Sequence, residues 1–366
     1  MKKIGIITIP DYNNYGNRLQ NYAARKFFQD LGCEVDTLEL NDLDFPQYKA
    51  RRIKLFLKKW KLKPLVYFFE LLKNSKKKVK RYIKFEKFTK KYLNVKYHPD
   101  GSMQNLKRIA TQYDYFVLGS DQIWHPTVNT TPNLFFATFA PSEKVLFFAP
   151  SFGLQELPET YAAQVKKHLA DKNNLTVREE SGRRIIQKIT GKDAKVLPDP
   201  TMCLVADDWI KIAACPREGK RYILKYFLGG MNDDYLRAIN KVKDEYRLPV
   251  WDIANADNTD GYITGPEDFL GCIWKADYVL TDSFHAVVFC LLFKKSFSFF
   301  SRLNEQGKNE GIDSRVDMLL DKFGLTNRKY PAQATKTPIN WELISEILNK
   351  EQQEVRDYFS TLMDLN

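Results

Sequence analysis

Lys3-Ile-Gly-Ile-Ile-Thr-Ile9 is a short β-branched run, which is typical of a buried parallel strand. An Asn- and Gly-rich loop follows over residues 11–17. Residues 19–31 then place apolar side chains at helical spacing, and Gly32 ends that pattern. Residues 35–40 alternate between apolar and polar side chains as a second strand does. This βαβ opening predicts a doubly wound α/β sheet.

The same alternation starts again in the second half of the chain. Two prolines within Pro198-Asp-Pro-Thr201 indicate a domain boundary. Beyond them, residues 222–227 predict a strand, and residues 278–281 predict a strand that runs into a helix over 284–293. Residues 341–362 predict a long closing helix. Two successive Rossmann-like halves facing a cleft resemble the GT-B architecture, so we expect that α/β fold class.

These boundaries divide the chain into three predicted parts. Residues 1–200 form an N-terminal Rossmann-like domain, with a basic helical insertion at about 48–92. Residues 201–340 form a C-terminal Rossmann-like domain, and residues 341–366 form the C-terminal helix. We expect ligands at the carboxyl ends of the strands, where open α/β sheets bind them.

Composition favours a folded protein of the cell interior. A hydrophobic content of 44% is ample for packed cores. The five cysteines are scattered and form no CxxC pair, which favours a reducing compartment. The apolar run over 4–9 is too short for a signal peptide, and no stretch approaches the roughly 18–20 apolar residues of a membrane span. We therefore expect a soluble, cytoplasmic protein.

The net charge of +12 is concentrated in one segment. Residues 49–91 carry 18 Lys or Arg against Glu70 and Glu86, a local net charge of +16 that leaves −4 for the rest. A nucleic-acid partner is therefore not expected. Over 51–60 and 65–72, aromatic and leucine side chains recur at near-helical spacing within this basic segment. Two interpretations are open: a helix lying on an anionic membrane surface, or an amphipathic insertion with a solvated basic face.

The first polar cluster lies between the first strand and the first helix. Gly16 allows backbone N–H groups to approach an anion at the helix N-terminus, and Asn14, Asn17 and Gln20 add hydrogen-bonding groups. This combination fits acceptor binding. An ordinary turn whose Asn residues cap the helix is the alternative interpretation.

The second cluster is Gly119-Ser-Asp-Gln-Ile-Trp-His125. Ser120, Gln122 and Trp124 combine polar groups with an apolar ring, as sugar-binding sets do, and Asp121 could act as a general base toward a hydroxyl. In the alternative interpretation, Trp124 belongs to the core and Asp121 caps a helix.

The third cluster follows the strand over 278–281. Ser283 and His285 fall at the start of an apolar helix, where a histidine can exchange a proton near neutral pH beside a helix N-terminus. Arg178, Arg302 and Arg315 are the candidate cations, because guanidinium groups bind carboxylate and phosphate in bidentate fashion. We expect no metal, since no metal-ligand cluster is visible.

Together these segments resemble the polysaccharide pyruvyl transferase family over about residues 1–325. The resemblance rests on six motifs in register: Tyr15-Gly-Asn-Arg-Leu-Gln-Asn-Tyr-Ala23, Leu118-Gly-Ser-Asp-Gln-Ile-Trp124, Ala149-Pro-Ser-Phe-Gly153, Val177-Arg-Glu-Glu-Ser181, Asp199-Pro-Thr201 and Thr281-Asp-Ser-Phe-His-Ala286.

The resemblance implies a GT-B-like fold and transfer of a pyruvyl group from phosphoenolpyruvate, a co-substrate, to sugar hydroxyls as a ketal. It places the active-site histidine at His285. By our own reasoning from the residues, His285 would be the acid and Asp121 the base, with the acceptor on the first domain and the donor on the second. Many family members carry Arg two positions before that histidine, where this chain has Ser283. Donor binding would then fall to Arg178, Arg302 or Arg315.

The predicted function is therefore pyruvyl transfer to a sugar of a cell-surface polysaccharide precursor. A sugar or a lipid-linked oligosaccharide would be the acceptor, with peripheral attachment to the inner face of the membrane through 49–91. A glycosyltransferase using a nucleotide sugar and a non-catalytic carbohydrate-binding relative are the alternatives.

Overall fold

The computed structural model describes residues 1–40, 76–98, 101–128, 132–255, 259–304, 306–309, 313–332 and 335–364. The chain forms two compact units. Unit 1 comprises Met1–Lys76, Phe85–Cys203 and Asp357–Asn366, and unit 2 comprises Lys77–Lys84 and Leu204–Arg356. Residues 48–75 of the predicted basic insertion lie outside the described residues.

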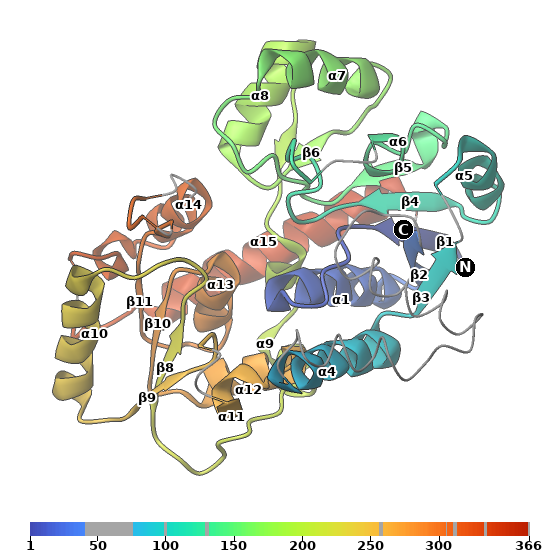
Figure 1. Ribbon diagram of the computed structural model, residues 1–366. Helices are drawn as coiled ribbons and strands as arrows, with labels where there is room; N and C mark the ends of the chain where they lie inside the picture. The colour runs from blue at the N-terminus through green and yellow to red at the C-terminus, as the bar shows by residue number, and fades with distance from the viewer. Residues whose placement is uncertain are drawn as a thin grey trace. The chain divides into compact units, whose positions relative to one another are not determined.

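Unit 1 is built on a five-stranded parallel sheet in the order β3-β2-β1-β4-β5 (Figure 1). The first strand sits in the middle because its apolar run is buried on both faces. The strands are β1 (Lys3–Ile7), β2 (Glu34–Leu40), β3 (Val95–His98), β4 (Tyr115–Leu118) and β5 (Val145–Phe147).

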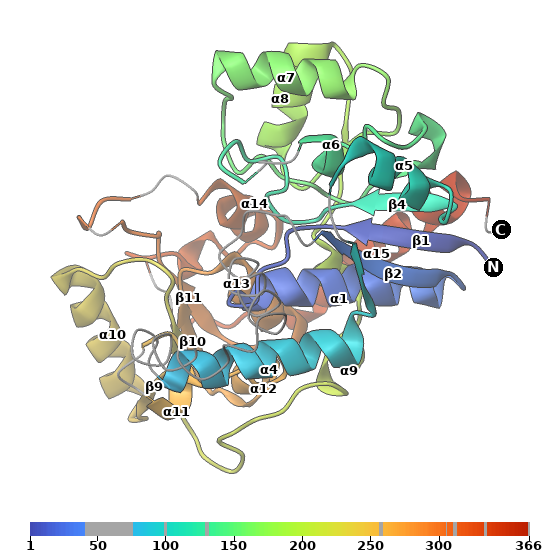
Figure 2. The same cartoon turned by 45° about the vertical axis from the view of Figure 1, so that its right-hand side comes forward.

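Helices cover both faces of this sheet (Figure 2). On one face, the rings of Phe27 and Phe28 in α1 (Tyr15–Asp30) pack with Phe148 and with Phe359 of α15 (Trp341–Leu362). On the other face, Leu106 of α5 joins the core cluster. The helices of this part of the chain are α1 (Tyr15–Asp30), α4 (Lys76–Tyr92), α5 (Met103–Ala110), α6 (Pro132–Phe135), α7 (Glu159–Leu169) and α8 (Glu180–Thr190).

A two-stranded parallel sheet completes unit 1. It pairs β6 (Thr176–Val177) with β7 (Lys195–Val196), and a 3₁₀ turn over Pro200–Cys203 ends the segment. The chain passes to unit 2 directly after that turn, close to the pair of prolines in the sequence.

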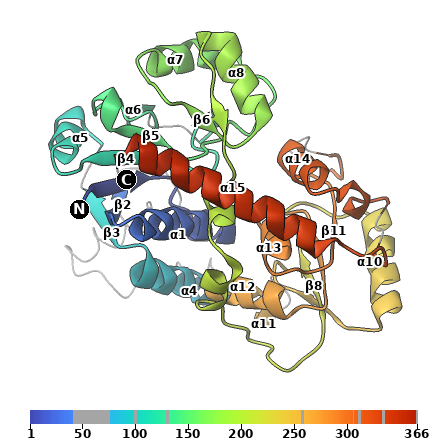
Figure 3. The same ribbon diagram turned by 180° about the vertical axis from the view of Figure 1, so that it is seen from behind.

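Unit 2 contains a four-stranded parallel sheet in the order β11-β10-β8-β9 (Figure 1), of which Figure 3 labels β8 and β11 from behind. Its strands are β8 (Ile223–Tyr226), β9 (Val250–Asp252), β10 (Tyr278–Thr281) and β11 (Phe297–Phe299). The helix α10 (Asp233–Tyr246) packs on one face, where Tyr235 contacts the ring of Phe300. The helix α12 (Pro266–Lys275) packs on the other face, where Phe269 contacts Tyr226.

The remaining helices include those that the sequence predicts over 284–293 and 341–362. They are α9 (Ala206–Ile210), α10 (Asp233–Tyr246), α11 (Thr259–Tyr262), α12 (Pro266–Lys275), α13 (Phe284–Leu292), α14 (Ser314–Lys322) and α15 (Trp341–Leu362). The residues of α15 divide between the two units after Arg356.

The predicted fold class is confirmed, because each unit is a parallel sheet with helices on both faces, as in a Rossmann-like domain. Within the described ranges, no helix combines the length and the apolar character needed to cross a bilayer.

Candidate functional site

The first two predicted clusters meet at the carboxyl edge of the unit 1 sheet. Asn14 caps α1 by accepting a hydrogen bond from the Asn17 backbone N–H at 3.2 Å. The Asn17 side-chain amide donates to Asp121 Oδ2 at 3.0 Å, and its oxygen accepts from the Asp11 N–H at 2.9 Å. The loops after β1 and β4 are therefore joined through one buried asparagine.

A second bridge joins the same two loops. The Gln20 amide donates to Thr8 Oγ1 at 2.8 Å, and its oxygen accepts from the Ser120 backbone N–H at 2.9 Å. Gln20 and Ser120 are fully buried, and Gly16 lies buried in the first turn of α1. Gly16, Gln20 and Ser120, three of the predicted acceptor-binding residues, therefore lie beneath the surface of this edge.

Asp121 and Gln122 reach the surface of this edge and are half-buried. Asp121 has a φ of 60°, a left-handed conformation that Asp tolerates better than most residues. Its Oδ1 accepts the Gln122 N–H at 2.9 Å. The Gln122 side chain packs on Gly153, where a Cβ atom would lie 2.0 Å from its amide nitrogen. Only glycine permits that approach.

Trp124 lies in the core of unit 1 and is fully buried. Its indole N–H donates to the Phe135 carbonyl oxygen at 3.1 Å. The ring stacks on Phe136 with 5.7 Å between centroids and also contacts Phe147 and Phe152. The core interpretation of Trp124 matches these contacts, whereas sugar stacking on this ring stays a prediction.

Arg178 forms a buried ion pair within unit 1. Its guanidinium donates to Asp199 Oδ2 at 2.9 Å, and Ser120 Oγ donates to the same oxygen at 3.1 Å. Burial lowers the pKa of Arg178, but the charges of Asp199, Glu179 and Asp121 outweigh that effect and raise it. The guanidinium is therefore a permanent charge with a partner in its own unit, and its role as a donor ligand stays a prediction.

His285 occupies the first turn of α13 at the carboxyl edge of the unit 2 sheet, as predicted. Ser283 caps the helix, since its Oγ accepts the Ala286 N–H at 3.5 Å. The other eight residues of α13 are buried, whereas His285 is half-buried. His285 is therefore the one residue of this otherwise buried, apolar helix that is half-buried.

Arg302 and Arg315 both contact the turn that precedes His285. The Arg302 guanidinium donates to the Asp282 carbonyl oxygen at 3.3 Å. The Arg315 guanidinium lies 5.7 Å from the centre of the Phe284 ring. Two cations from different segments therefore contact Asp282 and Phe284, the residues of this turn that precede the histidine in the chain.

Several residues of these clusters were quoted in the motifs but received no predicted role. Asp199, Ser151 and Glu179 belong to the unit 1 network, where Ser151 Oγ donates to Glu179 at 2.6 Å. Asp282 anchors the unit 2 edge through two backbone N–H groups. The sequence contained a signal for these residues, because each of them directly follows a predicted strand or stands in one of the six family motifs.

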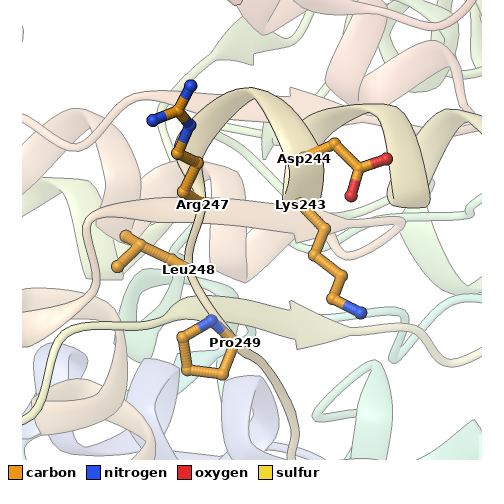
Figure 4. A pocket seen from close by; sticks show the side chains of 5 residues that line it. All are labelled: Lys243, Asp244, Arg247, Leu248 and Pro249. Atoms are coloured by element: carbon orange, nitrogen blue, oxygen red, sulfur yellow. The ribbon is translucent and has the colours of Figure 1, made fainter.

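A surface hollow in unit 2 lies away from these clusters. Its lining residues are Lys243, Asp244, Arg247, Leu248 and Pro249. They belong to the last turn of α10 and to the segment that leads from it to the amino end of β9, and their side chains point in different directions (Figure 4). In the part of the chain that the structure describes, no group of three or more His, Cys, Asp or Glu could hold a metal ion.

Two Rossmann-like units with polar clusters at the carboxyl ends of their strands define an α/β protein of the ligand-binding type. The chain belongs to the polysaccharide pyruvyl transferase family, whose model matches residues 14–304. This is a family of transferases, so the protein is an enzyme.

Other comparisons give more distant likenesses. No curated protein sequence matches the chain. The UDP co-structure of MnaA from S. aureus is 12% identical, with a TM-score of 0.45 over 100% of this chain and 98% of that one. The UDP-GlcNAc 2-epimerase from Neisseria meningitidis bound to UDP-GlcNAc is 10% identical, with a TM-score of 0.47 over 97% of this chain and 100% of that one.

Proposed function

We propose that the protein transfers the pyruvyl group of phosphoenolpyruvate to hydroxyls of a sugar in a polysaccharide precursor, forming a ketal and releasing phosphate. Family membership supports pyruvyl transfer. The observation that carries the donor assignment is the convergence of Arg302 and Arg315 on the turn before His285.

In this proposal, unit 2 binds the donor. Phosphoenolpyruvate carries a carboxylate and a phosphate, and a guanidinium group can hold either through two parallel hydrogen bonds. Ser283 stands where many family members carry Arg, and its side chain caps α13. Arg302 and Arg315 supply the positive charge that this position lacks, and the first N–H groups of α13 add favourable dipoles.

Unit 1 binds the acceptor through the surface of its edge. Asn14, Asp121 and Gln122 are half-buried there and offer hydrogen-bonding groups to sugar hydroxyls. Asn17 holds the Asp121 carboxylate in place by donating to Oδ2. Asp121 is therefore the proposed base for the acceptor hydroxyl.

The reaction involves no oxidation or reduction. Phosphoenolpyruvate enters it as a co-substrate, and the proposed steps use no cofactor. His285 in its protonated form gives a proton to the methylene carbon, which leaves a positive centre stabilised by the adjacent oxygen. One sugar hydroxyl bonds to that carbon and loses its proton to a general base. The carbon–oxygen bond to phosphate then breaks, a second hydroxyl takes its place, and that hydroxyl's proton leaves with phosphate or through solvent.

We also propose that α4 attaches the protein to an anionic membrane surface, which would place it at the cytoplasmic leaflet where lipid-linked acceptors are presented. Lys80, Lys87, Lys90 and Lys91 are exposed on one stripe of this helix, and Ile83 stands exposed among them. A juxtaposition of lysines with an apolar side chain favours anionic headgroups.

The donor assignment is tested by measuring binding of phosphoenolpyruvate and of a panel of nucleotide sugars by calorimetry. We expect phosphoenolpyruvate to bind, and Arg302→Ala to weaken that binding about tenfold or more. Arg221→Ala is the matched control, because Arg221 pairs with Asp277 at the opposite end of β10. With an acceptor sugar, phosphate release should accompany a mass gain of one pyruvate less one water. Binding of a nucleotide sugar but not of phosphoenolpyruvate would establish the glycosyltransferase alternative.

The membrane proposal is tested by flotation with vesicles containing phosphatidylserine. Changing Lys80, Lys87, Lys90 and Lys91 to Glu should abolish binding, and binding of the unchanged protein should weaken as salt rises. Four exposed basic residues of α7 and α8 supply a control of equal charge: Lys166, Lys167, Arg183 and Arg184. Equal loss of binding in both variants would refute attachment through α4.

A further inference from the structure

Asp282 occupies the centre of the carboxyl edge of the unit 2 sheet, directly after β10. Its side chain is almost fully buried. Oδ1 accepts the Leu228 N–H and Oδ2 accepts the Gly229 N–H, each at 2.8 Å. One carboxylate therefore holds the loop that follows the neighbouring strand β8.

The same residue also contacts the segment that follows β11. Arg302 Nε lies 3.5 Å from Asp282 Oδ2, and the Arg302 guanidinium donates to the Asp282 carbonyl oxygen at 3.3 Å. Asp282 thus connects the ends of three adjacent strands, β8, β10 and β11. Arg302 is fixed by two contacts, one with the side chain and one with the main chain of a single residue.

The glycines of the β8 loop make this arrangement compact. A Cβ atom at Gly229 would lie 2.5 Å from the Leu303 carbonyl oxygen and 2.6 Å from Arg302 Cγ. The Gly230 N–H donates to the Leu303 carbonyl oxygen at 2.7 Å. The loop can approach the stem of Arg302 this closely because residues 229 and 230 carry no side chain.

Burial raises the pKa of Asp282, whereas Arg302 and the two loop N–H groups act in the opposite direction. Burying this carboxylate therefore costs free energy, and the groups that compensate this cost all belong to the same edge of the sheet.

We infer that Asp282 is a positioning residue, which orients the Arg302 guanidinium and the Leu228–Gly230 loop for the anionic donor. This inference rests on the proposed function, because it takes Arg302 to be a residue that binds the donor. Its geometric part, the orientation of Arg302 by Asp282, can be measured without any donor.

The chain provides a matched control at the other end of the same strand. Asp277 directly precedes β10, accepts the Tyr222 backbone N–H at 3.1 Å, and accepts the Arg221 side chain at 2.9 and 2.7 Å. It offers the same chemical combination, a carboxylate with a backbone N–H and an arginine. It lies at the amino end of β10, away from His285.

The first experiment compares the rate at which phenylglyoxal modifies Arg302 in the unchanged protein, in Asp282→Asn and in Asp277→Asn, followed by peptide mass mapping. We expect Arg302 to react several-fold faster in Asp282→Asn and unchanged in Asp277→Asn. Equal rates in all three proteins would overturn the inference, whatever the donor is.

The second experiment measures phosphoenolpyruvate affinity in a double-mutant cycle of Asp282→Asn and Arg302→Ala. We expect Asp282→Asn alone to weaken binding about tenfold, as expected for loss of a hydrogen-bonded charge, and to have little further effect once Arg302 is absent. Asp277→Asn should leave affinity within about twofold at a comparable loss of thermal stability. Equal effects of Asp282→Asn with and without Arg302 would show that Asp282 does not act through it.

Gly229→Ala extends the test in case Asp282→Asn does not fold. The added methyl group would press on the Leu303 carbonyl oxygen and the Arg302 stem while Asp282 stays in place. We expect the same loss of phosphoenolpyruvate affinity and the same faster modification of Arg302. Unchanged values would contradict the inference. Failure of the unchanged protein to bind phosphoenolpyruvate would refute the proposed function but not the modification result.

Discussion

Replacing Arg178 with Ala should destabilise unit 1 by about 3–5 kcal/mol, the usual cost of removing one partner from a buried ion pair. The Arg178 and Asp199 side chains are 1% and 0% exposed. After the change, Asp199 would keep hydrogen bonds from the Thr201 N–H, from Thr201 Oγ1 and from Ser120 Oγ. These neutral donors compensate part of its charge, so we expect a value toward the lower end of that range.

The assay is urea unfolding, with hydrogen exchange of the peptide over 118–124 to localise the loss to unit 1. A double-mutant cycle with Asp199→Asn separates the ion pair from general packing. Neutralising Asp199 removes the unpaired charge, so the double variant should be less destabilised than the sum of the single changes. Arg178→Lys should rescue only in part, because an ammonium group cannot reproduce the guanidinium fork.

The opposite result would assign Arg178 to ligand binding. If Arg178→Ala unfolds within about 1 kcal/mol of the unchanged protein and weakens phosphoenolpyruvate binding roughly 30-fold, the guanidinium serves the donor and the structural argument is refuted.

His285→Ala should abolish pyruvyl transfer while changing the free energy of unfolding by less than about 1 kcal/mol, since the side chain is half-buried at a helix start; a loss of several kcal/mol in urea unfolding would point to a structural role. Trp124→Ala should cost about 3–5 kcal/mol in the same assay, because it leaves a cavity among aromatic rings, and a smaller loss would argue against the core assignment. Burial, with Lys167 and Lys172, lowers the pKa of His168. The unfolded chain therefore takes up this proton first, so thermal stability should fall as pH drops below about 6.5, and less steeply in His168→Gln.

The local sequence determined the strands and helices that form the carboxyl edges of the two sheets. The β-branched run at residues 3–9 and the helical spacing after it depend on neighbouring residues, and they appear as β1 and α1. The local sequence also determined the position of His285 at a helix start, because Ser283 is a good helix cap and the apolar residues that follow it form a buried helix. Periodicity and capping are short-range properties, so a sequence shows them directly.

Tertiary structure alone decided which polar side chains meet. Arg178 pairs with Asp199, 21 residues away, and Gln20 bonds to the Ser120 N–H, 100 residues away. Trp124 and Asp121 stand three residues apart in one motif, yet one is core and the other reaches the surface. No spacing encodes such pairings, because they follow from the order of strands in the sheet and from the cost of burying a charge without a partner. The same reason explains Asp282, whose carboxylate acquires its role only where the ends of three strands come together.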